Sequence, residues 1–186
     1  MNPPATVADS GIRPGVRVVG LDPGSRVTGW GAVDETDGRL RVVDFGVVRC
    51  PPREPLVLRL QRLHREIGDV IKRLQPDEVA VESVFSAANA KAALTLGHAR
   101  GAVLVAAANL PVAEYSPRSV KQALTGYGAA GKGSVAGMVA RRLGMAEPPD
   151  AEDAADALAV AICHGDARRA EARLARAVRQ PMVKLT

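Results

Sequence analysis

Short apolar runs separated by turn residues dominate the first part of the chain. Three such runs can be read, at residues 17–22, 28–33 and 40–48. The turn signal Pro23-Gly24 separates the first two, and a polar turn at residues 34–38 separates the second from the third. Runs of this length bounded by such turns predict β-strands paired as antiparallel hairpins. We therefore expect an antiparallel three-stranded meander, with Gly24 and Gly29 keeping the first hairpin tight.

From residue 56 the apolar positions recur at steps of three and four. They are Leu56, Leu60, Leu63, Ile67, Val70, Ile71 and Leu74. This spacing predicts an amphipathic helix that ends before Pro76. A short strand at residues 78–82 follows, and the order strand, helix, strand favours a crossover with parallel pairing. The first and fourth strands are then expected to lie near each other.

The second half of the chain predicts one further strand and four more helices. The strand is expected at residues 112–115, and the helices at residues 86–109, 117–124, 134–143 and 150–164. Ser86, Ser116 and Asp150 are the expected capping residues, because their side chains can accept a hydrogen bond from a free backbone N–H. The arginine-rich tail after Gly165 is expected to be helical or disordered. The pattern as a whole predicts an α/β domain with a mixed five-stranded sheet flanked by helices.

A stripe of small residues runs along the predicted helix at residues 86–109. Ala93, Gly97, Gly101 and Val105 recur at four-residue spacing. Small side chains let another helix approach closely. The stripe is either packed within one subunit or part of an interface between two subunits, and the sequence alone leaves both open.

Composition narrows the function classes. The 186 residues fit one domain, and the net charge of +5 favours a polyanionic partner. Cys50 and Cys163 are the only cysteines, and no Cys/His cluster has zinc-finger spacing, which argues against a disulfide framework or a structural zinc. No apolar run has membrane-spanning length and no signal pattern opens the chain, so we expect a cytoplasmic protein without a membrane partner.

Four acids occupy positions where they can converge. Asp22 ends the first predicted strand and Glu82 ends the fourth, while Asp153 and Asp156 lie three residues apart on the last main helix. Like charges at that spacing repel unless a cation or water separates them. The simpler interpretations are a turn-capping aspartate and a solvated helix start. Taken together, the oxygen-only set suits two Mg²⁺ or Mn²⁺ ions for phosphodiester hydrolysis.

Four segments of the sequence resemble the bacterial RuvC family of crossover junction (Holliday junction) endodeoxyribonucleases. They lie at residues 20–29, 81–85, 96–101 and 153–159. The resemblance runs from about Val16 to His164 and implies a ribonuclease-H-like fold, a homodimer and divalent-metal catalysis. It divides the chain into a disordered leader at residues 1–15, a nuclease domain at residues 16–165 and a basic tail at residues 166–186.

The resemblance also assigns roles to individual residues. Asp22, Glu82, Asp153 and Asp156 match the family's four catalytic, metal-binding carboxylates. Phe85 matches an aromatic residue that stacks on or wedges between bases at the junction. Lys121 and Lys132 match basic residues near the DNA backbone, and Arg118 is a further DNA-binding candidate. Lys132 lies on a glycine-rich loop, where it is expected to stabilise charge on the transition-state phosphate.

The implied function is resolution of four-way DNA junctions in recombination and repair. Paired symmetric nicks near the crossover would leave 5′-phosphate and 3′-hydroxyl ends, and a branch-migration motor is an expected partner. The alternatives are a related nuclease acting on RNA precursors and a non-catalytic junction-binding protein. Phe85 and the long small-residue helix favour the junction enzyme, and four acids without metal would only repel DNA. An actin-like ATPase would need two similar domains, for which the chain is too short.

Overall fold

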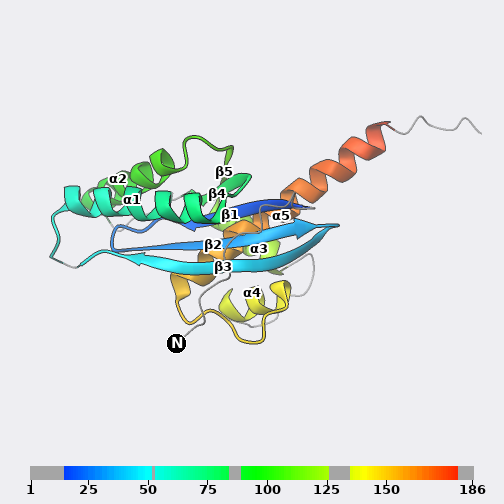
Figure 1. The fold of residues 1–186 in the computed structure, drawn as a ribbon, viewed down its shortest axis with the longest axis horizontal. Helices are drawn as coiled ribbons and strands as arrows, with labels where there is room; N and C mark the ends of the chain where they lie inside the picture. Colours follow the sequence, from blue (N-terminus) through cyan, green and yellow to red (C-terminus); the bar gives the residue numbers. More distant parts are fainter. Residues whose placement is uncertain (1–14, 52, 84–88, 126–134, 180–186) are drawn as a thin grey trace, which may run out of the picture.

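The computed structural model describes residues 15–51, 53–83, 89–125 and 135–179. Within these ranges the chain forms five strands and five helices around one sheet (Figure 1). The elements are β1 (Val16–Asp22), β2 (Val27–Thr36), β3 (Arg39–Arg49), α1 (Leu56–Leu74), β4 (Glu78–Glu82), α2 (Ala90–Ala106), β5 (Val112–Tyr115), α3 (Pro117–Thr125), α4 (Val135–Leu143) and α5 (Glu152–Arg179). The expected α/β class with a mixed five-stranded sheet is confirmed.

The sheet has the strand order β3-β2-β1-β4-β5. β1, β2 and β3 pair antiparallel, whereas β4 pairs parallel with β1 and β5 pairs parallel with β4. The meander followed by a crossover is therefore as predicted. In this register Leu21 of β1 lies beside Val81 of β4, so both strands end at the same edge of the sheet.

Helices cover both faces of the sheet. α1 and α2 pack on one face, where Leu63 and Ile67 of α1 are fully buried. α3, α4 and α5 cover the opposite face (Figure 1). α1 has the predicted bounds and ends at Gln75, which adopts a left-handed backbone conformation before Pro76. No described helix is both long enough and apolar enough to cross a membrane.

α2 is shorter than predicted at both ends. It begins at Ala90, with the Asn89 side chain accepting a hydrogen bond from the backbone N–H of Ala92 at 2.9 Å. The expected cap, Ser86, lies outside the described residues. Asn and Ser are equally good capping residues, so the sequence alone could not choose between them. At the other end the helix closes in a turn after Ala106 rather than continuing to residue 109.

The small-residue stripe of α2 faces away from the subunit core. The buried residues of α2 are Ala99 and Val103, which lie on another side of the helix. A Cβ atom added to Gly97 or Gly101 would meet nothing within 4 Å among the described residues, and Val105 is 64% exposed. Packing within this subunit therefore does not account for the stripe.

α5 runs through the body of the domain and continues well past the predicted end near residue 164. It remains helical to Arg179, so the first part of the basic tail is a helix rather than a disordered segment. Its buried portion is rich in alanine and packs between the sheet on one side and α3 and α4 on the other. Alanine and arginine are strong helix formers, which explains the continuation.

The backbone of α5 lies directly on glycines of β1 and β2. A Cβ atom placed on Gly29 would come 1.8 Å from the Asp153 carbonyl oxygen, and one on Gly20 would come 2.1 Å from that of Ala157. The interpretation of Gly29 as a hairpin residue was therefore incomplete, because this glycine makes room for α5. Gly24 does fit the hairpin role, since its Cβ would lie 2.0 Å from the Val27 carbonyl oxygen.

Substituting alanine for Gly29 tests this close approach. We expect Gly29→Ala to lower the free energy of unfolding by about 1–3 kcal/mol, because α5 must move away from the sheet to admit the methyl group. Urea denaturation measures the change. Gly68→Ala on α1 is the matched control, since nothing lies within 4 Å of its added Cβ. It should stabilise by about 0.5–1 kcal/mol. Equal effects of the two variants would contradict the account.

Candidate functional site

The four predicted carboxylates come from three elements that meet at one edge of the sheet. Asp22 is the last residue of β1 and Glu82 the last residue of β4. Because these neighbouring strands are parallel, their final side chains lie at the same edge. Asp153 and Asp156 belong to the start of α5, where negative charge is favoured by the helix dipole.

The register of the first hairpin brings α5 to Asp22. Asp22 is paired across β1 and β2 with Gly29, and the Asp153 carbonyl packs against that same glycine. A side chain at residue 29 would push the first turn of α5 away from the strand end. The glycine therefore sets how closely Asp153 and Asp156 approach Asp22.

Asp22 lies in an environment that opposes its ionisation. Burial, followed by the charges of Glu82, Asp156 and Asp153, raises the pKa of Asp22 from 3.8 to about 7. In its protonated form Asp22 donates a hydrogen bond to Glu82, which further favours the neutral carboxyl. The structure thus brings Asp22 within electrostatic reach of all three other predicted acids.

The pKa values of Glu82 and Asp156 are raised as well. Burial and then the charge of Asp156 raise the pKa of Glu82. Burial, followed by the charges of Glu152 and Asp153, raises the pKa of Asp156. The positive charge of Lys121 on α3 acts to lower the pKa of both groups. In both groups the pKa remains raised despite this lysine.

The predicted DNA-contacting residues divide into two groups. Arg118 and Lys121 both lie on the exposed side of α3. Lys121 is close enough to influence Glu82 and Asp156, whereas Arg118 lies one turn earlier on the helix. Phe85 and Lys132 lie outside the described residues. Their roles remain predictions from the resemblance.

A hydrogen-bonded network at the start of β4, the end of the strand opposite to Glu82, was not predicted. The Tyr115 hydroxyl lies 2.8 Å from Nδ1 of His164, and Nε2 of His164 lies 2.6 Å from a Glu78 carboxylate oxygen. Arg168 pairs with the same carboxylate. Although burial acts to raise the pKa of Glu78, the hydrogen bonds from His164 and Arg168 outweigh it and lower that pKa. The network ties α5 to β4 and β5.

The backbone next to Glu82 is fixed by the same strand pair. The carbonyl oxygen of Tyr115 accepts hydrogen bonds from the backbone N–H of Ser83 at 2.8 Å and from its hydroxyl at 3.0 Å. Ser83 therefore positions the end of β4 from which Glu82 projects. The sequence offered no signal for this contact, because residues 83 and 115 are brought together only by the parallel pairing.

The raised pKa of Asp22 predicts a pH-dependent effect of Asp22→Asn. Between pH 4 and 7 the Asp22 carboxyl is ionised in the unfolded chain but stays protonated in the folded chain. The free energy of unfolding therefore decreases as the pH rises through this range. In EDTA, the substitution should increase the free energy of unfolding at pH 8 by on the order of 2 kcal/mol, and much less at pH 5. Urea denaturation at the two pH values checks this.

The control for that measurement is Asp69→Asn, which removes an exposed carboxylate on α1. It should change stability little and equally at both pH values. A gain for Asp22→Asn that is the same at pH 5 and pH 8 would contradict the raised pKa.

Comparisons with known proteins agree on one family. The family model described as crossover junction endodeoxyribonuclease RuvC matches residues 18–164. A protein of that name from Magnetococcus marinus is 48% identical over 156 residues, covering 83% of this chain and 86% of its own length. The corresponding Desulforamulus reducens protein is 48% identical over 149 residues, covering 79% and 91% respectively.

Solved structures give the same result. The Thermus thermophilus RuvC structure superposes with a TM-score of 0.73 at 42% identity, covering 83% of this chain and 96% of the other. T. thermophilus RuvC in complex with a Holliday junction substrate gives a TM-score of 0.72 at 40% identity, with the same coverage. The yeast mitochondrial Holliday junction resolvase Ydc2, at 15% identity and a TM-score of 0.62, shares the fold. The chain belongs to the RuvC family of crossover junction endodeoxyribonucleases.

Proposed function

We propose that this chain resolves four-way DNA junctions by metal-assisted phosphodiester hydrolysis. The observation that carries the proposal is the convergence of four carboxylates at one edge of the sheet, where burial and mutual repulsion raise the pKa of Asp22 to about 7. Acids gathered in this way favour the binding of divalent cations, whose charge would offset their mutual repulsion. Membership of the RuvC family, and a 40% identical relative solved with a Holliday junction substrate, support DNA junctions as the substrate.

The donor set fits a hard divalent ion. The candidate ligands Asp22, Glu82, Asp153 and Asp156 offer only carboxylate oxygens, which suit Mg²⁺ or Mn²⁺. Among the described residues, no three acidic, histidine or cysteine side chains already surround a single ion position. The proton that Asp22 retains up to a pKa of about 7 would compete with a metal ion for the same oxygens, so we propose that Asp22 acts as a ligand once that proton is lost.

The chemistry divides between the ions and the chain. Two such ions, when bound, activate a water molecule and stabilise the departing 3′ oxygen, leaving a 5′-phosphate and a 3′-hydroxyl. The chain contributes the ligands, which must be deprotonated, so activity should rise with pH as Asp22 ionises. Lys121 is placed to approach the DNA backbone beside Glu82 and Asp156. Lys132 is proposed to stabilise charge on the phosphate, and Phe85 to stack on or wedge between bases.

Two symmetric nicks require two active sites. A four-way junction is cut on two strands related by a two-fold axis, and an isologous homodimer supplies one site for each strand. The outward-facing stripe on α2, with Gly97 and Gly101 unobstructed, is our candidate for the dimer interface. Because the proposed substrate is chromosomal, we also propose that the enzyme acts in the cytoplasm alongside a branch-migration motor.

A synthetic four-way junction tests the function. With Mg²⁺ or Mn²⁺, the protein should make paired symmetric nicks whose products a ligase reseals. Asp22→Asn should lower the cleavage rate by at least about 100-fold, since loss of even an outer-shell metal partner costs about 10–100-fold. Gel analysis of end-labelled strands measures both effects.

The matched control is again Asp69→Asn, which removes the same charge from an exposed position on α1 and should cleave like the wild type. A structured RNA of similar size tests the alternative substrate class. Preferential cutting of that RNA, or full junction cleavage by Asp22→Asn, would refute the proposed function.

A further inference from the structure

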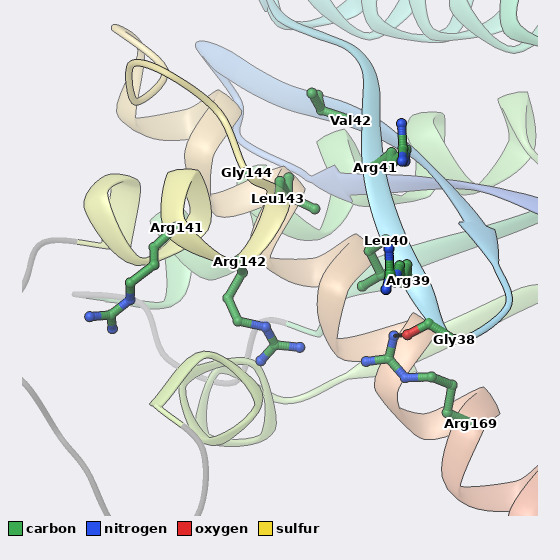
Figure 2. Close-up of a pocket in the computed structure, with 10 residues that line it drawn as sticks. All are labelled: Gly38, Arg39, Leu40, Arg41, Val42, Arg141, Arg142, Leu143, Gly144 and Arg169. Carbon is green, nitrogen blue, oxygen red and sulfur yellow. Dashed lines mark hydrogen bonds between the residues drawn. The ribbon is translucent and has the colours of Figure 1, made fainter.

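A basic pocket lies at the end of the sheet opposite the four carboxylates. It is a cavity of about 650 Å³ between the start of β3, the end of α4 and the middle of α5 (Figure 2). Its lining carries five arginines: Arg39 and Arg41 of β3, Arg141 and Arg142 of α4, and Arg169 of α5. They come from three elements that are separated in the sequence, so only the fold creates this concentration of positive charge.

Two of these arginines are held in fixed orientations. Arg142 donates hydrogen bonds to both carboxylate oxygens of Asp166 at 2.8 Å and to the Ala123 carbonyl at 2.6 Å. Arg169 also pairs with Asp166 and donates to the Gly38 carbonyl at 2.9 Å. One carboxylate thus orients two guanidinium groups and balances only one of their charges. Each guanidinium retains N–H donors beyond those used here.

Arg141 adds a further charge to the lining, next to Arg142 on α4. It is exposed in the last turn of α4, and within the described part of the chain it forms no hydrogen bond or ion pair. Of the three apolar residues in the lining, Leu40 is 9% exposed and Leu143 is 6% exposed, while Val42 is partly exposed. The accessible lining is therefore mainly guanidinium and backbone, which suits an anionic ligand rather than an apolar one.

α5 connects this pocket to the catalytic end of the molecule. Asp156 and Arg169 are 13 residues apart on the helix, which corresponds to about 20 Å at 1.5 Å per residue. The phosphates of one DNA strand are about 3.4 Å apart along the duplex axis, so the separation spans about six nucleotide steps. Arg173 and Arg176 extend the face of Arg169 further along the exposed helix.

We propose that the pocket formed by Arg141, Arg142 and Arg169 binds the phosphate backbone of a junction arm, about six nucleotide steps from the cut. Guanidinium groups with a fixed orientation match the paired oxygens of a phosphate. The contact is independent of base sequence and adds to affinity rather than to the chemical step. This proposal rests on the proposed function for the identity of the DNA, and on the basic pocket for the contact itself.

A charge-reversal variant tests the contact by binding alone, in EDTA, so that no strand is cut. Fluorescence anisotropy of a labelled four-way junction over a range of salt concentrations gives the slope of log affinity against log salt. Arg141→Glu should weaken binding and reduce that slope by about 1 or more. Lys72→Glu is the matched control, because it reverses an exposed charge in the last turn of α1 on the opposite face of the sheet. It should leave the slope unchanged.

Neutral phosphates locate the contact on the DNA. Methylphosphonates placed about 5–8 steps from the crossover on all arms should weaken binding of the wild type by at least about threefold more than they weaken binding of Arg141→Glu. Methylphosphonates about 1–2 steps from the crossover should affect both proteins equally. The proposal would be overturned if the distant methylphosphonates weakened binding of the two proteins equally. It would also be overturned if Arg141→Glu left the salt slope unchanged.

Two further measurements distinguish a DNA contact from a protein contact, and the arm contact from catalysis. If Arg141→Glu weakens binding of polyglutamate but not of the junction, the pocket takes an acidic protein and the DNA proposal is wrong. Cleavage of the junction by the wild type in Mg²⁺ is scored separately. Absence of nicks would refute the proposed function, whereas the binding results alone decide the arm contact.

Discussion

The contact between the backbone of α5 and the glycines of β1 and β2 determines the geometry of this domain. Gly20 and Gly29 admit the helix so closely that a single added methyl group would overlap carbonyl oxygens of α5. The alanine-rich side of the helix is complementary, because its small side chains let α3 and α4 approach from the other side. The geometry of the carboxylate cluster thus depends on positions that carry no functional group.

That close packing explains how the protein tolerates a cluster of acids. Burial and mutual repulsion disfavour the ionised forms of Asp22, Glu82 and Asp156 by raising the pKa of each. The stability lost there is offset by the almost completely buried segment of α5 that follows, including Leu158 and Ile162. The pair formed by His164 and Glu78 fastens the same helix to β4 two turns further on. Packing contacts away from the carboxyl groups therefore help to hold the acids together.

Much of this arrangement followed from the sequence, because the relevant signals are local. Apolar alternation and turn residues predicted the meander, and three- and four-residue spacing predicted α1 with its observed bounds. The convergence of Asp22 and Glu82 was predictable because both end strands that the crossover makes parallel. The expected placement of Asp153 and Asp156 needed only the helical period and a helix packed on the sheet.

What the sequence did not predict depends on contacts between distant segments. Gly29 was interpreted as a turn residue because its partner, the Asp153 carbonyl, lies more than 120 positions later. The cap of α2 involved a choice between two suitable residues, and the structure places it at Asn89. The pocket with Arg142 and Arg169 depends on Asp166 turning two guanidinium groups toward each other. Asp166 and Arg169 are three residues apart on α5, but Arg142 comes from another helix, and no local spacing relates it to them.

The clustered carboxylates are proposed to bind divalent cations once they are deprotonated. The most direct measurement is the pKa of the Asp22 side chain, obtained by carbon-13 NMR of the aspartate carboxyls and assigned with Asp22→Asn. The account predicts a pKa of about 7 in EDTA and a marked decrease when Mg²⁺ is added, since the metal competes with the proton. An ordinary aspartate pKa in EDTA, or a pKa unaffected by saturating Mg²⁺, would contradict it.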